Sequence, residues 1–361
     1  MAQALALGRR GLGRTWPNPS VGCVIVSEGR IVGRGWTQPG GRPHAEVMAL
    51  AEAGEAARGA TAYVTLEPCS HHGKSPPCSD ALIAAGVARV VSAMPDPHAV
   101  VDGQGHDDLR AAGIDVQTGV LEVEAADAHA GFFSVLARGR PWLTLKLATS
   151  FDGRIATATG ESRWITGPDA RRQVHAQRMI HDAVLVGGGT ARADDPDLRV
   201  RDLGAACQPV RIVAARHLNL PKPMKLLENA SAAEPVWLLH GSEDGDVPDA
   251  EKARFERPGV KLLPVPVGHG GQLDPLGLLE ALGAAGLTRV FCEGGGALAA
   301  SLLAADAVDE LIGFTAGLAL GAEGRPALGA LGVDRLSEAP RFQLVETRVA
   351  GADVMHRWRR T

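Results

Sequence analysis

The chain has 361 residues, which is long for one domain and predicts two domains that each bury a core. Apolar residues make up 45% and charged residues 22% of the sequence, as in a soluble globular protein. The net charge of −4 argues against a nucleic-acid-binding surface, and no apolar run is long enough to span a membrane. The sparse, odd set of five cysteines and an N-terminus without a signal-peptide core favour a cytoplasmic protein.

The first part of the chain combines a hairpin with alternating helices and strands. Small and apolar residues at helical spacing follow His44, and Gly59 is a candidate C-terminal cap of that helix. In chain order we expect a helix over 1–11, two strands around a turn at 27–29, a helix over 44–59, a strand over 61–67, a helix over 76–86, a strand over 88–97, a short helix, a strand over 114–120 and a helix over 122–141. This order predicts a sheet with helices packed on it.

A second series of strands and helices begins after the Gly139–Pro141 break. We expect strands at 142–156, 182–190, 209–215, 235–241 and 288–296, and helices at 169–181, 273–286 and 297–306. Alternating strands and helices predict a largely parallel sheet. The predicted domains are therefore 1–141 and 142–361.

Four residues of the first domain have the pattern of a catalytic zinc site. A histidine and two cysteines, His44, Cys69 and Cys78, supply three ligands and leave a fourth position open for water. His44 and Cys78 fall at predicted helix starts, where the partial positive charge stabilises a thiolate. Glu46 lies near enough to take a proton from such a water without binding the metal.

Two other interpretations of these residues are open at this point. Cys69 and Cys78 can be ordinary buried thiols, with His44 as a helix-capping residue. A structural zinc site is a second alternative, in which His71 or His72 would be the fourth ligand. The co-occurrence of His-Ala-Glu, Pro-Cys and Cys in one strand–helix frame favours catalytic zinc.

The eight residues between the two cysteines distinguish this chain from deaminases that end in Pro-Cys-x-x-Cys. With this long loop, the motifs "TWPNPSVGCVIV", "HAEVMAL" and "TLEPCSHHGKSPPC" resemble the deaminase domain of the bifunctional deaminase/reductase family of riboflavin biosynthesis. The resemblance implies a cytidine-deaminase-like α/β/α domain, with zinc on His44, Cys69 and Cys78 and with Glu46 as proton shuttle. It also implies substrate contacts at Asn18, Ala45, His71 and Lys74. Without it, Asn18 can be a turn residue and Lys74 an exposed loop lysine.

Two glycine triplets in the second domain, Gly187–Gly189 and Gly294–Gly296, each follow a predicted strand. Glycines at such positions let the backbone approach a phosphate at a helix start. Neither triplet has the G-x-G-x-x-G spacing of a dinucleotide site, and tight turns with close helix packing are the alternative.

The motifs "LKLATSFDGRIA", "GESRWITGPDARRQVHAQR", "VLVGGGTARADDPDLRVR" and "EGGGALAASLL" resemble the reductase domain of the same family. The resemblance implies a dihydrofolate-reductase-like α/β domain that uses NADPH; no ribose 2′-phosphate pocket can be located from the residues themselves. The implied cofactor contacts are Ala148, Trp164, Thr190, Asp194, Gly295, Gly296, Ala297 and Leu298. The implied substrate contacts are Ser162, Arg178, Leu198, Arg201 and Glu293.

Lys146 and Asp194 are the candidate catalytic residues of the second domain. They would orient the ribose or move a proton. A buried lysine is costly unless it is paired, so the alternative for Lys146 is a structural ion pair with Asp152 or Asp194. Arg178 and Arg201 can also be solvent-exposed residues of a helix face or loop. Substrate binding is the other interpretation, because a guanidinium group can form two parallel hydrogen bonds to a sugar phosphate.

The implied function is a two-step conversion of a phosphorylated pyrimidine. Zinc-dependent deamination of 2,5-diamino-6-(5-phosphoribosylamino)pyrimidin-4-one would precede NADPH-dependent reduction of the ribosyl group to ribityl. The resemblance also implies a homo-oligomer with no nucleic-acid or membrane partner. The alternatives are a nucleoside or RNA-base deaminase with an unrelated oxidoreductase domain, a zinc- and nucleotide-binding sensor without turnover, and an enzyme with one active domain.

Overall fold

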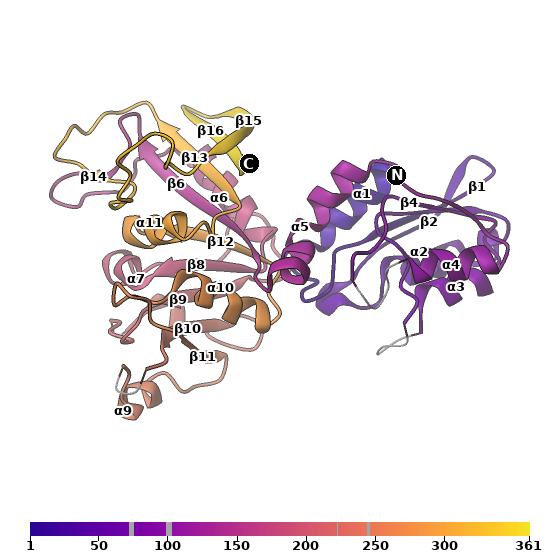
Figure 1. Ribbon diagram of the computed structural model, residues 1–361, viewed down its shortest axis with the longest axis horizontal. Helices are drawn as coiled ribbons and strands as arrows, with labels where there is room; N and C mark the ends of the chain where they lie inside the picture. Colours follow the sequence, from indigo (N-terminus) through magenta and orange to yellow (C-terminus); the bar gives the residue numbers. More distant parts are fainter. Residues whose placement is uncertain (72–75, 99–102, 222, 244–245) are drawn as a thin grey trace. The chain divides into compact units, whose positions relative to one another are not determined.

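A computed structural model describes residues 1–71, 76–98, 103–221, 223–243 and 246–361 (Figure 1). The chain divides into two units, Met1–Gly139 and Arg140–Thr361. Each unit has its own β-sheet, and the overall α/β fold class is the one that the sequence predicted.

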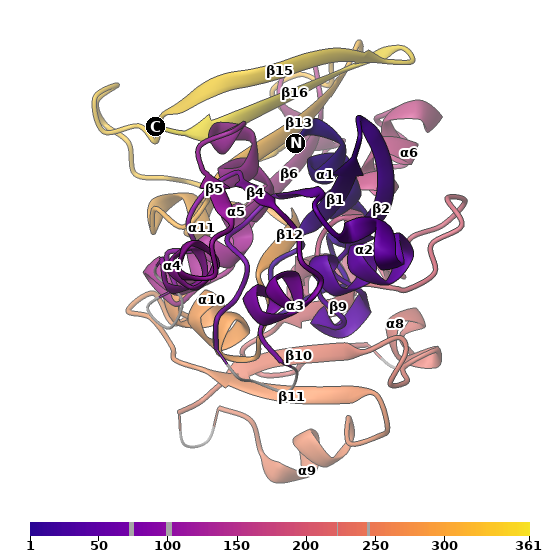
Figure 2. The same cartoon turned by 90° about the vertical axis from the view of Figure 1, so that its right-hand side faces the viewer.

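The N-terminal unit is a five-stranded sheet between two layers of helices. The strand order is β2-β1-β3-β4-β5; β1 is antiparallel to both β2 and β3, whereas β3, β4 and β5 are parallel to one another. Helices α1 and α5 cover one face, and α2, α3 and α4 cover the other (Figures 1 and 2). The strands are β1 (Gly22–Ser27), β2 (Arg30–Trp36), β3 (Thr61–Val64), β4 (Arg89–Ser92) and β5 (Asp115–Gln117). The helices are α1 (Ala2–Gly8), α2 (Ala45–Ala53), α3 (Cys78–Ala84), α4 (Gln104–Ala111) and α5 (Glu122–Arg138).

Helix α2 lies directly against strand β2 because two glycines of the strand have no side chain in the way. A Cβ atom on Gly33 would lie 2.1 Å from the carbonyl oxygen of Ala49, and one on Gly35 would lie 1.9 Å from that of Ala45. These distances are far below van der Waals contact. The two glycines therefore fix the position of the helix that carries His44 and Glu46 at its start.

Helix α2 is shorter than the sequence predicted. It ends at Ala53 rather than at Gly59, because Gly54 takes a φ of 53° and breaks the α-helical hydrogen bonding. A 3₁₀ turn over Gly54–Ala57 follows. Gly59 also has a positive φ, but it serves the turn that enters β3.

The C-terminal unit is a nine-stranded sheet in the order β11-β10-β9-β8-β12-β6-β13-β16-β15. The seven strands from β11 to β13 are parallel, which agrees with the predicted parallel sheet, although β11 and β13 were not among the predicted strands; β16 and β15 add an antiparallel edge. Helices α10 and α11 lie on one side of the sheet and α6 on the other (Figures 1 and 2). The strands of the sheet are β6 (Trp142–Ser150), β8 (Ala183–Gly187), β9 (Val210–Ala214), β10 (Val236–Gly241), β11 (Val260–Val265), β12 (Arg289–Gly294), β13 (Glu310–Ala316), β15 (Phe342–Ala350) and β16 (Asp353–Arg360).

The remaining elements connect and cover this sheet. A small ribbon pairs β7 (Arg154–Ala156) with β14 (Arg325–Pro326). The helices are α6 (Pro168–Met179), α7 (Gly188–Asp194), α8 (Lys225–Glu228), α9 (Asp249–Ala253), α10 (Pro275–Ala284) and α11 (Gly296–Ala304). The first glycine triplet is therefore a helix start, since α7 begins at Gly188 directly after β8.

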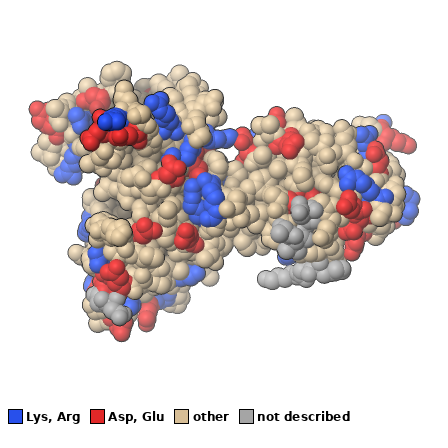
Figure 3. Space-filling model, in the orientation of Figure 1, with Lys and Arg blue, Asp and Glu red and all other residues tan. Residues whose placement is uncertain are grey.

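The surface is mixed in charge. On the face shown in Figure 3, basic and acidic side chains alternate over both units, and the described part of that face carries no broad area of one sign. Among the described residues, no helix combines the length and the apolar character needed to cross a bilayer.

Candidate active sites

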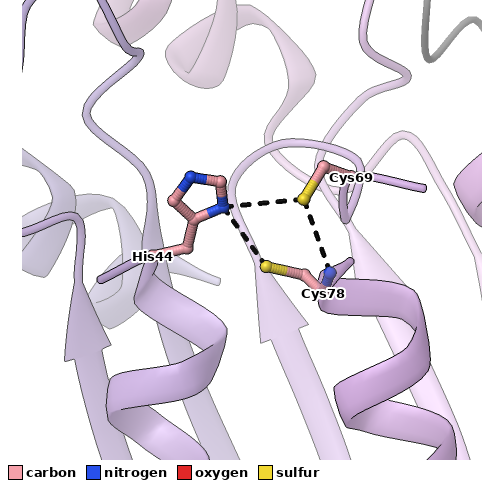
Figure 4. Close-up of side chains that lie close together, drawn as sticks. All are labelled: His44, Cys69 and Cys78. Carbon is pink, nitrogen blue, oxygen red and sulfur yellow. Dashed lines mark hydrogen bonds between the residues drawn. The ribbon is translucent and has the colours of Figure 1, made fainter. Parts of the chain in front are cut away.

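Three residues that are far apart in the sequence meet at one edge of the N-terminal sheet (Figure 4). His44 precedes the first turn of α2, Cys78 is the first residue of α3, and Cys69 lies in the loop that follows β3. The Nδ1 atom of His44 lies 3.6 Å from the Cys69 sulfur and 3.3 Å from the Cys78 sulfur. All three potential ligand atoms lie within 4.8 Å of one another.

The chemistry of this donor set fits zinc. One imidazole nitrogen and two sulfurs make three protein ligands, and catalytic zinc sites keep a fourth position open. A hydrogen bond from the Cys78 side chain is the largest cause that lowers the pKa of the Cys69 thiol, to about 4; His44 and the Cys78 backbone N–H, which lies 3.4 Å from the Cys69 sulfur, act in the same direction. Cys69 is therefore held as the thiolate, which is the form that binds a metal.

Glu46 lies in the first turn of α2 and lines the same cavity as His44 and Cys69, the two candidate ligands that the described lining includes. The cavity has a volume of about 190 Å³. Glu46 is 3% exposed, and burial raises the pKa of its carboxyl group to about 7. A carboxyl group with such a pKa can both accept and release a proton near neutral pH.

The predicted substrate residues of this unit differ in their positions. Asn18 and His71 line the cavity, and the Asn18 side-chain amide is held by donation to the Gly41 carbonyl at 3.1 Å. Ala45 is fully buried between His44 and Glu46 and is not among the described residues that line the cavity. Lys74 lies outside the described residues.

Sequence reasoning missed several described residues that line this cavity, among them Arg42, Glu67, Asp96 and His98. Asp96 follows β4, and Glu67 follows the neighbouring parallel strand β3. The carboxyl ends of parallel strands meet at one edge of a sheet. The motifs "TLEPC" and "MPDPH" each stand at the end of a predicted strand, and this pattern could have indicated that Glu67 and Asp96 lie near the site.

The C-terminal unit has a larger cavity, about 830 Å³ in volume, beside β8, β12 and β6. The sheet order reverses here, since β8 to β11 lie on one side of β12 and β6 and β13 on the other. Ligands of open α/β sheets bind at such a switch point. Ten of the predicted residues line this cavity: Lys146, Ala148, Ser162, Trp164, Arg178, Thr190, Asp194, Leu198, Arg201 and Glu293.

A buried ion-pair cluster lies in the wall of this cavity. Glu293 on β12 accepts hydrogen bonds from Nε and Nη2 of Arg178, and its Oε2 lies 4.0 Å from the Lys146 Nζ. Burial lowers the pKa of Lys146. The partner of Lys146 is thus Glu293, and the alternatives Asp152 and Asp194 were wrong. Asp152 instead accepts hydrogen bonds from Ser150 and from two backbone amides of the 320–321 turn.

The second glycine triplet forms the turn between β12 and α11. Gly295 has a φ of 100°, and a Cβ atom there would lie 2.8 Å from the Thr190 hydroxyl oxygen. That hydroxyl donates to the Gly294 carbonyl at 3.2 Å, which joins the two glycine turns. The predicted contacts Gly295, Gly296, Ala297 and Leu298 form this turn and the start of α11, outside the described lining of the cavity. A glycine turn that leads into a nine-residue helix suits the phosphates of a dinucleotide, so these residues fit NADPH.

Comparison with known proteins agrees with this division. Residues 1–94 match the family model "Cytidine and deoxycytidylate deaminase zinc-binding region", and residues 141–356 match "RibD C-terminal domain". The riboflavin biosynthesis protein RibD of Escherichia coli is 45% identical over 357 residues, which cover 98% of this chain and 96% of the relative. The chain belongs to the RibD family.

Solved structures support the same family assignment. An Acinetobacter baumannii RibD structure is 38% identical with a TM-score of 0.87, covering 100% of this chain and 97% of that one. A diaminohydroxyphosphoribosylaminopyrimidine deaminase/5-amino-6-(5-phosphoribosylamino)uracil reductase of Thermotoga maritima is 34% identical with a TM-score of 0.86, with the same coverage.

Membership of the RibD family establishes the class of this enzyme. The chain is a bifunctional deaminase and reductase of riboflavin biosynthesis, with a zinc-dependent cytidine-deaminase-like unit and an NADPH-dependent, dihydrofolate-reductase-like unit. The family and the fold that the sequence motifs predicted are thus confirmed.

Proposed function

We propose that the N-terminal unit hydrolyses the 2-amino group of 2,5-diamino-6-(5-phosphoribosylamino)pyrimidin-4-one. Water enters at C2, ammonia leaves, and a 2-oxo group remains. The observation that carries this proposal is the cavity that His44, Cys69 and Glu46 line together, with the Cys78 sulfur within 4.8 Å of the other two ligand atoms. Asn18 and His71 line the same cavity and are proposed to hold the pyrimidine.

In this proposal His44, Cys69 and Cys78 hold zinc, which when bound makes water a nucleophile near neutral pH. Glu46 takes the proton of the attacking water and gives a proton to the leaving amine. Its raised pKa suits both transfers, because neither its charged nor its neutral form dominates near pH 7. Burial of Glu46 keeps bulk water from competing for the proton.

The C-terminal unit is proposed to reduce the deaminated product at C1′ of its ribosyl group. NADPH, when bound along Trp164, Thr190 and the 295–298 turn, supplies the hydride. The bond between C1′ and the ring oxygen opens, and that oxygen takes up a proton to become a hydroxyl group of the ribityl chain. Lys146 and Asp194 are the residues proposed to orient the ribose or supply this proton.

Binding of the substrate in the reductase is assigned to residues from several elements. Ser162, Arg178, Leu198, Arg201 and Glu293 line the larger cavity and surround the space beside Lys146. Arginine pairs bidentately with phosphate oxygens, so Arg201 is proposed to hold the 5′-phosphate. Arg178 is already bonded to Glu293 and is proposed to fix that carboxylate beside the substrate.

The deaminase half of the proposal is tested by ammonia release from the diaminopyrimidine phosphate. Wild-type protein releases ammonia, and both removal of zinc by a chelator and the substitution Glu46→Gln abolish the release. Ammonia release that survives both treatments would overturn the zinc mechanism. The reductase half is tested by NADPH oxidation when the deaminated compound is supplied directly.

The remaining inferences concern the assembly and location of the enzyme. We infer a homo-oligomer that works in the cytoplasm, as the family resemblance implies. All five cysteines are unpaired thiols, which supports a reducing compartment. Light scattering on the purified protein tests the assembly, and a monomer at micromolar concentration would contradict it.

A further inference from the structure

Arg211 is a fully buried arginine on an interior strand of the C-terminal sheet. It lies on β9, which is paired on both sides by the parallel strands β8 and β10, and it is 0% exposed. A buried guanidinium is costly unless fixed partners compensate its charge. Its Nη2 donates to the Glu234 carbonyl at 2.6 Å and lies 3.4 Å from that of Asn229.

The charge partners of Arg211 form a cluster of two cations and two carboxylates. Asp197 and Glu234 lie 4.0 Å and 3.7 Å from the Arg211 guanidinium nitrogens. Arg199 contacts the same two carboxylates: its Nε donates to Asp197 at 2.8 Å, and its Nη1 lies 3.6 Å from Glu234. The cluster therefore ties the 195–201 segment to the strand beneath it.

The segment held by this cluster has a strained backbone. Leu198 has a φ of 60° and Asp195 a φ of 40°, in the left-handed region that residues with a Cβ atom disfavour. Such conformations persist only where the surrounding structure imposes them. Asp197 and Arg199, the cluster members on this segment, are the residues on either side of Leu198. Leu198 itself is 2% exposed.

The same segment forms part of the reductase cavity. Leu198, Arg199 and Arg201 line that cavity, whereas Arg211 and Glu234 are not among its described lining residues. The Arg199 carbonyl accepts a hydrogen bond from Nη1 of Arg178 at 2.8 Å. Arg178 in turn bonds to Glu293, beside Lys146. A displacement of Arg199 would thus also disturb Arg178 and, through it, Glu293.

We propose that Arg211 is a positioning residue of the reductase: from strand β9 it holds the strained 195–201 segment in the conformation that receives the substrate. Arg211 does not touch the substrate in this account. The inference rests on the proposed function, since it takes Leu198 and Arg201 to be substrate contacts. It predicts that loss of Arg211 weakens substrate binding to the reductase and leaves the deaminase unchanged.

The test compares Arg211→Met with Arg211→Lys and with the control Arg140→Met. Arg140 is also buried and makes a bidentate pair with Asp309, at 2.8 and 3.0 Å, away from the described lining of the reductase cavity. Reductase KM and kcat are measured on the deaminated substrate, and ammonia release by the same sample is the internal standard. Hydrogen exchange of the 198–201 amides gives a readout that does not depend on catalysis.

Arg211→Met is expected to raise the reductase KM about tenfold or more, with a smaller change in kcat and faster exchange of these amides. Arg211→Lys keeps the positive charge but lacks the planar guanidinium group, so its KM is expected to lie between those of wild type and Arg211→Met. Arg140→Met is expected to leave the KM within about twofold of wild type even where stability falls.

A folded Arg211→Met protein with the wild-type KM would overturn the inference, and so would an equal rise in the Arg140→Met control. If Arg211→Met does not fold, the test rests on the reductase KM of Arg211→Lys. A wild-type KM in that variant overturns the inference, and a raised KM supports it. Failure of the proposed function is distinguishable, because wild-type protein would then not reduce the substrate at all.

Discussion

Glu67 is a buried carboxylate of the deaminase unit that is held by backbone hydrogen bonds. The Glu67 carboxylate accepts three backbone N–H groups, from Asp96 at 3.0 Å and from Gly103 and His106 at 3.2 Å. Its side chain is 0% exposed. One carboxylate thus fixes the loop after β4 and the start of α4 against the segment that carries Cys69.

The substitution Glu67→Gln tests this role. A glutamine amide places an NH₂ group where a carboxylate oxygen accepts, so at least one buried backbone N–H loses its partner. We expect a loss of about 1–3 kcal/mol in the free energy of unfolding, together with lower deaminase activity. Urea denaturation and ammonia release measure the two effects. Asp115→Asn is the control, because Asp115 pairs with Arg89 at the surface and is 69% exposed; an equal loss in both variants would contradict the account.

His181 makes the stability of the reductase unit depend on pH. Burial lowers its pKa from 6.5 to about 3. Its Nδ1 donates to the Gln177 carbonyl at 2.7 Å, so in the neutral ring Nε2 is the acceptor that faces Thr144 at 3.1 Å. The folded protein therefore binds fewer protons than the unfolded chain between these two pKa values. The contribution of neutral His181 to the free energy of unfolding is complete above about pH 6.5. It falls by up to about 4 kcal/mol as the pH falls toward 3.

The measurement is the urea midpoint for loss of reductase activity at pH 7.5 and pH 5, in wild type and in His181→Gln. The wild-type midpoint is expected to fall between the two pH values by more than that of the variant. Equal falls in the two proteins would show that other groups set the acid sensitivity.

Candidate site residues that belong to short sequence motifs could be located from the sequence, and residues whose contacts are all long-range could not. His44, Glu46, Cys69 and Cys78 were recognisable because each lies at a strand end or helix start within a typical motif. Arg211 gives no such signal: its partners come from two other segments, near residues 197 and 234, and only the folded sheet brings them together.

At the scale of elements, the approach of α2 to β2 sets the position of the deaminase residues. Gly35→Ala adds a Cβ atom that would lie 1.9 Å from the Ala45 carbonyl oxygen, so α2 must shift. We expect a destabilisation of about 1–3 kcal/mol and a loss of bound zinc. Metal analysis and thermal unfolding measure these effects.

Gly270→Ala is the matched control for this prediction, because a Cβ atom at Gly270 meets nothing within 4 Å. Its zinc content and melting temperature should equal those of wild type. Full zinc occupancy in Gly35→Ala would contradict the proposed role of the glycine.

The order of elements was predictable because hydrophobic runs, glycines and prolines alternate clearly along most of the chain. The C-terminal hairpin β15–β16 was not predicted, because β15 is an edge strand whose residues are mostly exposed and show no alternation of apolar and polar positions. The early end of α2 was also missed, since propensity alone does not show which of the two glycines, Gly54 or Gly59, ends the α-helix.

At the scale of the whole molecule, each of the two sites is built within one unit. The deaminase cavity draws its described residues from the 1–139 unit and the reductase cavity from the 140–361 unit. A mixture of Glu46→Gln and Lys146→Met proteins is therefore expected to restore the two-step conversion that neither variant completes alone. A lag in NADPH oxidation is expected, because the intermediate must accumulate in solution. A mixture that stays inactive, although each variant retains its other activity, would contradict this independence.

Deamination in one unit is proposed to precede reduction in the other. The most direct measurement follows ammonia and NADPH in one progress curve, with the diaminopyrimidine phosphate as substrate. We expect one NADPH to be oxidised for each ammonia released. We also expect that Glu46→Gln oxidises no NADPH until the deaminated compound is added. NADPH oxidation by Glu46→Gln at the wild-type rate, on the diaminopyrimidine phosphate itself, would contradict it.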